Sequence, residues 1–136
     1  MIVGDLNEDV GEYVQHDGEY ITALMPEGAS APAVRSLTVT SDPRRAGRGQ
    51  EGPVFYSPWL SSTDAGSYFH GGRWERLDQA LVLPGTNQAV SASLSVVNHP
   101  ELLTADGRPA RYDSRTGYGY SDHLPVLVTL RLEPVR

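Results

Sequence analysis

Three short polar groups carry side chains suited to chemistry on a phosphoryl group. "GDLN" contains Asp5 and Asn7, "RLDQALV" contains Asp78, and "SDHLPV" contains Asp122 and His123. A carboxylate can deprotonate water, and an amide N–H can steady a phosphoryl oxygen. A carboxylate can also orient a histidine and stabilise its protonated form. Together these groups supply the parts of a hydrolytic site.

The first group follows a short apolar run, Met1 to Val3. Gly4 lets the backbone turn, and strand alternation sends Asp5 and Asn7 to the same side. An ordinary Asp-Asn turn would account for the same residues.

The second group places Asp78 among apolar neighbours, so its carboxylate is expected to be partly desolvated and to need a partner. A histidine is the natural partner. The alternative is a surface aspartate paired with Arg73 or Arg76.

The third group stands where a loop meets an alternating strand expected over residues 124–132. Pro125 belongs at the beginning or the edge of that strand, because it has no N–H. Loop-to-strand junctions often carry catalytic side chains, since the scaffold is rigid and the site stays open. Asp122 and His123 could equally be turn residues only.

The remaining pattern predicts a strand-rich chain with one or two short helices. We expect a strand over residues 1–3 that Gly4 ends, and a long loop over 27–53 with one possible strand at 36–40. Asp17 is a candidate cap for a short helix that buries three apolar side chains. These side chains are Tyr20, Ile21 and Leu24.

The second half of the chain is predicted to contain mainly strands. Residues 67–70 and 73–83 are expected to form a hairpin that turns at Gly71-Gly72. A further strand is expected at 91–97, followed by one helical turn capped by Asn98 with Pro100 in its first turn. Residues 107–120 read as a loop.

Composition restricts the classes of protein. The chain has 136 residues, the usual size of one domain, and a net charge of −6 with arginine as its only basic residue besides histidine. With no cysteine, disulfides and thiolate metal sites are excluded. No apolar run reaches the length of a membrane span, and the N-terminus lacks the regions of a signal peptide. We expect a soluble protein, cytoplasmic or secreted, with its compartment left open.

Other chemistry-bearing residues have weaker patterns. An acidic chain needs a local basic patch to bind nucleic acid, and residues 35–48, with Arg44, Arg45 and Arg48, form either a solvated loop or a phosphate contact. Four aromatic side chains are expected in the core, with base stacking as the alternative. These are Trp59, Tyr68, Phe69 and Trp74. Three histidines without a partner pattern are expected at the surface or in loops: His16, His70 and His99.

The order "GDLN … RLDQALV … SDHLPV" resembles the C-terminal half of the endonuclease/exonuclease/phosphatase family, which has the deoxyribonuclease-I-like fold. "GSYFHGGRWERLDQALV" and "LLTADG" before "YGYSDHLPV" resemble a bacterial branch of it. The resemblance covers nearly the whole chain. It implies an α+β fold class: the second half of a four-layer α/β/β/α sandwich, mostly antiparallel strands with one or two short helices. Residues 1–136 would be the C-terminal part of one such domain.

By this resemblance the protein is an Mg²⁺-dependent phosphoric-ester hydrolase, a nuclease or a phosphatase. Asp5 would position or deprotonate the attacking water, and Asn7 would hold the scissile phosphate. His123 would contact the phosphate with Asp78 orienting its imidazole, and Asp122 would reach the metal, as Asp5 also could. An oxygen-only shell favours Mg²⁺, with Mn²⁺ in its place as an alternative.

The family's first half, which supplies the main metal-binding Glu, has no counterpart in this sequence; Glu8 and Glu12 follow the first motif in a loop. The chain is therefore expected to be a piece of a longer protein, a half-domain completed by a second chain, or a catalytically silent binding or assembly module. Without the first half, Ile2, Val126 and Val128 should be partly exposed. The substrate, a nucleic acid or a small phosphoester, is left open.

Overall fold

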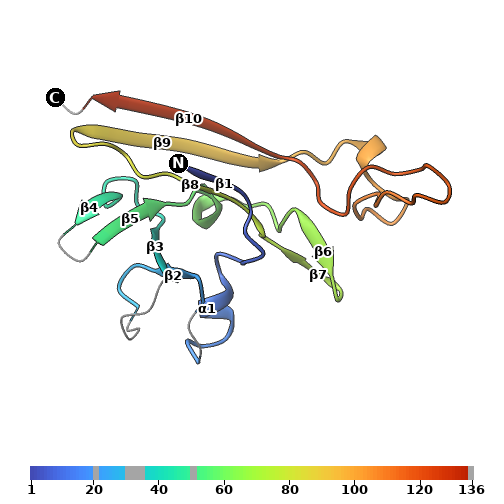
Figure 1. Ribbon diagram of the computed structural model, residues 1–136, viewed down its shortest axis with the longest axis horizontal. Coiled ribbons are helices and arrows are strands. Elements are labelled where there is room, and N and C mark those ends of the chain that lie inside the picture. Colours follow the sequence, from blue (N-terminus) through green and yellow to red (C-terminus); the bar gives the residue numbers. More distant parts are fainter. Residues whose placement is uncertain (20–21, 30–35, 50–51, 135–136) are drawn as a thin grey trace.

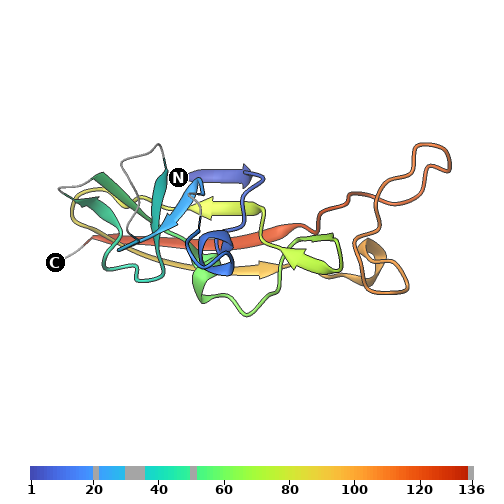
Figure 2. The same ribbon diagram turned by 90° about the horizontal axis from the view of Figure 1, so that it is seen from below.

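The computed structural model describes residues 1–19, 22–29, 36–49 and 52–134. The molecule is elongated: a long two-stranded ribbon runs along it, smaller strand pairs lie on one side, and a long loop projects at one end (Figures 1 and 2). The fold is α+β, mostly strands with a few short helices, which confirms the predicted class.

The long ribbon consists of β9 (Gln88–Val96) and β10 (Val126–Pro134), paired antiparallel with Val96 opposite Val126. Burial alternates along both strands: one face is half-buried, and the other, with the serines of β9, is exposed. Both strands were expected, although each has shifted boundaries. β10 begins one residue after Pro125, because proline has no N–H to pair.

β1 (Ile2–Asp5) and β8 (Asp78–Leu81) form a separate antiparallel pair in which Asp5 lies opposite Asp78. The prediction that Gly4 ends the first strand is wrong, since pairing continues through Gly4 to Asp5. An isolated bridge joins the end of β8 to β5 (Gly52–Tyr56): Tyr56 and Val82, the residue after β8, exchange two backbone hydrogen bonds of 2.8 and 2.9 Å.

The predicted hairpin is confirmed as β6 (Tyr68–His70) and β7 (Arg73–Glu75). Gly71 and Gly72 both have positive φ, 57° and 89°, which glycine adopts without strain. The prediction of one strand over 73–83 is wrong. The chain breaks pairing after Glu75 and continues as β8, because β8 finds its partner in β1.

A four-stranded sheet in the order β2-β3-β5-β4 fills the region predicted to be mostly loop. The expected strand is confirmed as β3, but three more accompany it. Their bounds are β2 Leu24–Pro26, β3 Leu37–Thr40, β4 Gly47–Gly49 and β5 Gly52–Tyr56. The other three strands are short and rich in glycine and proline, so their side-chain pattern is weak.

Among the described residues, none between Asp17 and β2 is helical, in contrast to the predicted helix after Asp17. The helix α1 spans Glu12–Gln15, and Asp17, with φ 53°, comes after its end. Leu24 is buried as expected, but in strand β2. Tyr20 and Ile21 lie outside the described residues.

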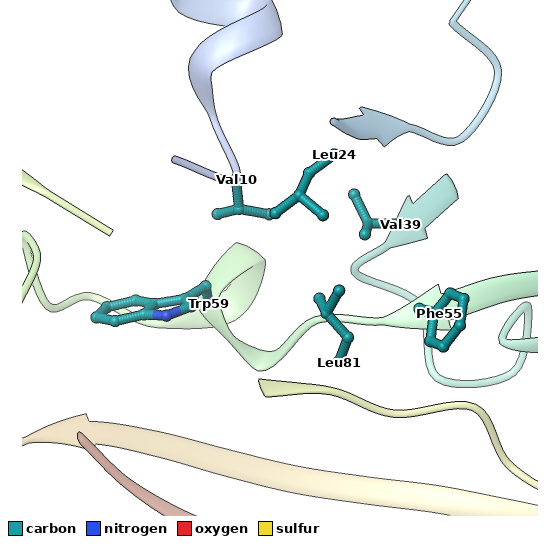
Figure 3. Packing of buried hydrophobic residues seen from close by; sticks show 6 residues of the cluster. All are labelled: Val10, Leu24, Val39, Phe55, Trp59 and Leu81. Carbon is teal, nitrogen blue, oxygen red and sulfur yellow. The ribbon is translucent and has the colours of Figure 1, made fainter. Parts of the chain in front are cut away.

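The core lies between these small elements (Figure 3). Two side chains are fully buried: Trp59, from the 3-10 helix Pro58–Ser61, and Leu81. They pack with side chains from the segment before α1 and from β2, β3 and β5. These are Val10, Leu24, Val39 and Phe55. Burying one such side chain contributes about 1.5–3 kcal/mol, so this cluster holds β8 and its neighbours in place.

The apolar inner face of the ribbon is less well covered. Ile2, Val126 and Val128 are half-buried, as the sequence predicts. Together with Val3 and Ala80, the last two line an apolar groove of about 370 Å³.

Residues 97–125 form a long extension with little regular structure, including the loop predicted at 107–120. Its 3-10 helix, Pro100–Leu102, is capped by His99, whose Nδ1 accepts from Glu101 N, and not by Asn98 as predicted. Across the described ranges, no helix has the length and apolar character needed to cross a membrane.

Candidate active site

Asp78 and His123, which lie 45 positions apart in sequence, are joined by a hydrogen bond of 2.7 Å between Asp78 Oδ2 and His123 Nδ1. The backbone places the two residues near each other. Asp78 begins β8, and the chain just before β10 is tied to the hairpin by Leu124 N, which donates to Ser67 O at 2.8 Å. Neither Arg73 nor Arg76 makes an ion pair with Asp78, in contrast to the surface alternative; Arg73 pairs with Glu75.

The hydrogen bonds around Asp78 fix the tautomer of His123. Ser67 Oγ, which is fully buried, donates to the same Asp78 oxygen at 2.5 Å. An ionised carboxylate only accepts, so Nδ1 of His123 must carry the hydrogen. In the neutral ring Nε2 is then left unprotonated and faces away from Asp78.

Asp5 lies on the other side of this ring. Its Oδ2 is 3.9 Å from His123 Nε2, while its Oδ1 accepts from the backbone N–H of Asn7 at 2.8 Å. Asn7 adopts a positive φ of 51°, a conformation that asparagine tolerates well. The turn therefore holds one oxygen of Asp5 and aims the other at His123. One oxygen atom of a ligand can lie about 2.8 Å from both groups.

Two aromatic residues contact the Asp78–His123 pair. The ring of Tyr68 stacks on His123 with centroids 4.6 Å apart, and Trp59 Nε1 donates to the backbone oxygen of Asp78 at 2.6 Å. Trp59 is in the core, as expected, while Tyr68 is half-buried at the site. Sequence reasoning assigned no role to Ser67, and its only signal is its place between Gly66 and the aromatic hairpin. A Cβ on Gly66 would collide with the backbone of Glu75.

The two residues predicted to bind metal, Asp5 and Asp122, have different charged neighbours. Asp122 Oδ2 lies 3.9 Å from Arg111 Nε, whereas Asp5 lies against His123. Within the part of the chain that the structure describes, no group of three or more His, Asp or Glu side chains could hold a metal ion. A hard cation prefers about six oxygen ligands. These residues alone do not fit a complete Mg²⁺ site, and metal binding by Asp5 and Asp122 stays a prediction.

The other predicted candidates lie apart from this cluster. Arg44 pairs with Asp42, which lowers the pKa of that exposed carboxyl, and Arg45 pairs with Glu27. Glu8 accepts from Ala23 N at 2.6 Å. The arginine contacts are ion pairs of a surface loop, and the Glu8 contact is a hydrogen bond that links two segments of the chain.

The site is thus a cluster of Asp5, Asp78 and His123, with Asn7 joined through the backbone and Asp122 next to it along the chain. No family model, curated protein or solved structure matches the chain.

Proposed function

We propose that the protein is a phosphoric-ester hydrolase that depends on Mg²⁺ or Mn²⁺, in keeping with the order of its three motifs. The observation that carries this proposal is the 2.7 Å bond from Asp78 to His123, which leaves Nε2 facing the Asp5 carboxylate at 3.9 Å. A base and an oriented imidazole then share one small space that is partly open to solvent. Asp5 is 40% exposed and His123 is 22% exposed.

Each residue has a role in hydrolysis. Asp5 accepts a proton from water, whose oxygen forms a bond to phosphorus as the ester P–O bond on the opposite side breaks. The departing oxygen takes a proton from solvent. His123 in its protonated form donates from Nε2 to a phosphoryl oxygen, and Asp78 stabilises that form. The amide of Asn7 adds a second donor.

The metal would neutralise charge that develops on the phosphoryl oxygens. Asp5 and Asp122 would contribute to its shell, but two separate carboxylates do not complete it. The proposal therefore includes a further carboxylate-bearing segment, either in a longer form of the protein or on a second chain.

The test is hydrolysis of bis(p-nitrophenyl) phosphate by this chain and by any longer product of the same gene, with Mg²⁺, with Mn²⁺ and with EDTA. We expect metal-dependent release of nitrophenol that His123→Ala reduces by about 100-fold or more. His99→Ala is the matched control, because His99 is exposed and its contacts, a cap on a 3-10 helix and a 4.0 Å approach to Glu101, lie within the extension. Correctly folded protein that hydrolyses nothing in either form would refute the proposal and favour the silent binding module.

A further inference from the structure

A second cavity, of about 300 Å³, adjoins the candidate site and is rich in arginine. We call it the basic cavity. The β6–β7 hairpin forms one wall and the long extension the other. It is lined by Tyr68, Phe69, His70, Gly71, Gly72, Arg108, Pro109, Arg111 and Asp122. Tyr68 stacks on His123 and Asp122 precedes it, so a ligand held by His123 has this cavity beside it.

Arg108 makes two contacts at this cavity, although its side chain is 57% exposed. Its guanidinium lies 4.8 Å from the ring centroid of Phe69, and its Nε is 3.0 Å from Asp106 Oδ2. A hydrogen bond from the Thr104 hydroxyl is the main cause that keeps the pKa of Asp106 below its usual value, and the charge of Arg108 contributes least. These contacts direct the guanidinium toward the side of the cavity that Phe69 lines.

Arg111 is more open. Its side chain is 79% exposed, and its Nε is 3.9 Å from Asp122, beyond hydrogen-bond distance. The backbone beneath it is fixed, since Tyr120 N donates to Ala110 O at 2.7 Å and Gly119 packs against Arg111 O. A planar guanidinium on a fixed backbone is suited to bidentate contact with a phosphate.

Tyr68 also lines a cavity of opposite character, of about 260 Å³, which we call the acidic cavity. It contains three carboxylates and one guanidinium: Asp9, Glu12, Glu75 and Arg73. The basic cavity is lined by two guanidinium groups and one carboxylate, and Asp106 pairs with Arg108 beside it. An anionic chain that is bound at His123 would therefore continue into the basic cavity and be repelled from the acidic one.

We propose that the basic cavity is the subsite for the nucleotide that flanks the scissile phosphate, and that the substrate is a single strand of nucleic acid. This rests on the proposed hydrolase function. Arg108 and Arg111 contact the neighbouring phosphate, and the exposed ring of His70, which stacks on Tyr68 at 5.9 Å, offers a surface for a base. A chain of net charge −6 needs such a local patch to hold a polyanion.

The first test compares two substrates. Arg108→Gln and Arg111→Gln should each lower kcat/KM for a short single-stranded oligonucleotide by about tenfold, and leave kcat/KM for bis(p-nitrophenyl) phosphate within about twofold. Arg115→Gln is the matched control: Arg115 belongs to the same extension, pairs with Asp113 at 3.7 Å and lines neither cavity. Equal losses on both substrates, or no loss on the oligonucleotide, would overturn the subsite.

The second test needs no activity. Binding of a fluorescent oligonucleotide in EDTA is measured by anisotropy over a range of salt concentrations. Each Arg→Gln substitution should weaken binding and reduce the salt slope by about one, whereas an abasic strand should bind more weakly to the wild type. Equal binding of the abasic strand would overturn the nucleotide assignment. If the wild type binds the oligonucleotide but cleaves neither substrate, and the variants bind it more weakly, the hydrolase proposal fails and the subsite stands.

Discussion

Asp5 and Asp78 lie opposite each other across β1 and β8, yet their surroundings differ. One Asp78 oxygen accepts from both Ser67 and His123, and the side chain is 24% exposed. Asp5 is 40% exposed, and its Oδ2 makes only the 3.9 Å approach to His123. Asp78 is attached to the core, since the buried Trp59 donates a hydrogen bond to its backbone oxygen. Asp5 is the last residue of β1 and leads into an exposed turn.

This difference shows how two aspartates on one pair of strands can have different chemical roles. A carboxylate whose oxygen already accepts two hydrogen bonds is suited to hold a ring in place. A carboxylate with an open oxygen is suited to take a proton. Position in the sheet supplies the proximity of the two residues, and the turn or the core behind each one decides its chemistry.

Asp5→Asn should have the largest effect if Asp5 is the base. The amide keeps an oxygen to accept from Asn7 N, so the turn persists, but it cannot take a proton from water. We expect kcat to fall by about 10³-fold or more with little change in melting temperature. Measurement of kcat and Tm together checks this. Retention of more than about a tenth of wild-type activity would assign the base elsewhere.

Asp78→Asn and His123→Ala should each lower kcat by about 10²–10³-fold, and the double variant should be little worse than either. The reason is that the two residues act as one unit through their 2.7 Å hydrogen bond. A double-mutant cycle measures the coupling. Losses that multiply would show that the two residues act independently.

Asn7→Gly separates the side chain of Asn7 from its backbone. Glycine tolerates the positive φ of 51°, so the bond to Asp5 remains while the amide donors are lost. We expect kcat/KM to fall by about 100-fold with little change in Tm, the lower end of the effect of losing one donor to a developing oxyanion. An unchanged kcat/KM would exclude the Asn7 side chain from phosphate binding.

Ser67→Ala should have the smallest effect on catalysis. It removes one donor to Asp78 but leaves the bond to His123. We expect a loss of about 1.5–3 kcal/mol in the free energy of unfolding, typical of a hydrogen bond to a charged group, with kcat within about tenfold of wild type. Chemical denaturation and steady-state kinetics distinguish the two. A loss of kcat as large as that for Asp78→Asn would make Ser67 part of the orienting unit.

Sequence patterns predicted the parts of the fold that repeat over many residues. The alternation in β9 and β10 was sufficient to predict both strands, though not their pairing with each other, and the Gly71-Gly72 turn was sufficient to predict the hairpin. The sheet β2-β3-β5-β4 was missed, because strands of three to five residues with glycine and proline are stabilised by pairing with distant neighbours. The break between β7 and β8 was missed for the same reason.

The site was predictable only where residue type implies chemistry. Asp5 and His123 stand out as ionisable groups at strand ends and Asp78 as a carboxylate within a predicted strand, and the structure brings the three together. The residue types of Ser67 and Tyr68 do not indicate a role in the site. Their contacts with Asp78 and His123 depend on where the hairpin packs. Asp122 was expected beside a metal, but its contact with Arg111 depends on the path of a loop without a regular pattern.

The pairing of β1 with β8 has a consequence for folding kinetics. Asp5 and Asp78 come from distant parts of the chain, and His123 follows 45 positions after Asp78. The entropy of closing such long loops is lost before their contacts can form, so this cluster should assemble slowly and late. Trp59 reports on the same event, because its indole donates to the backbone of Asp78. During refolding of a Trp74→Phe variant, in which Trp59 is the single tryptophan, fluorescence and catalytic activity should therefore recover together, after most of the strand signal in circular dichroism has returned.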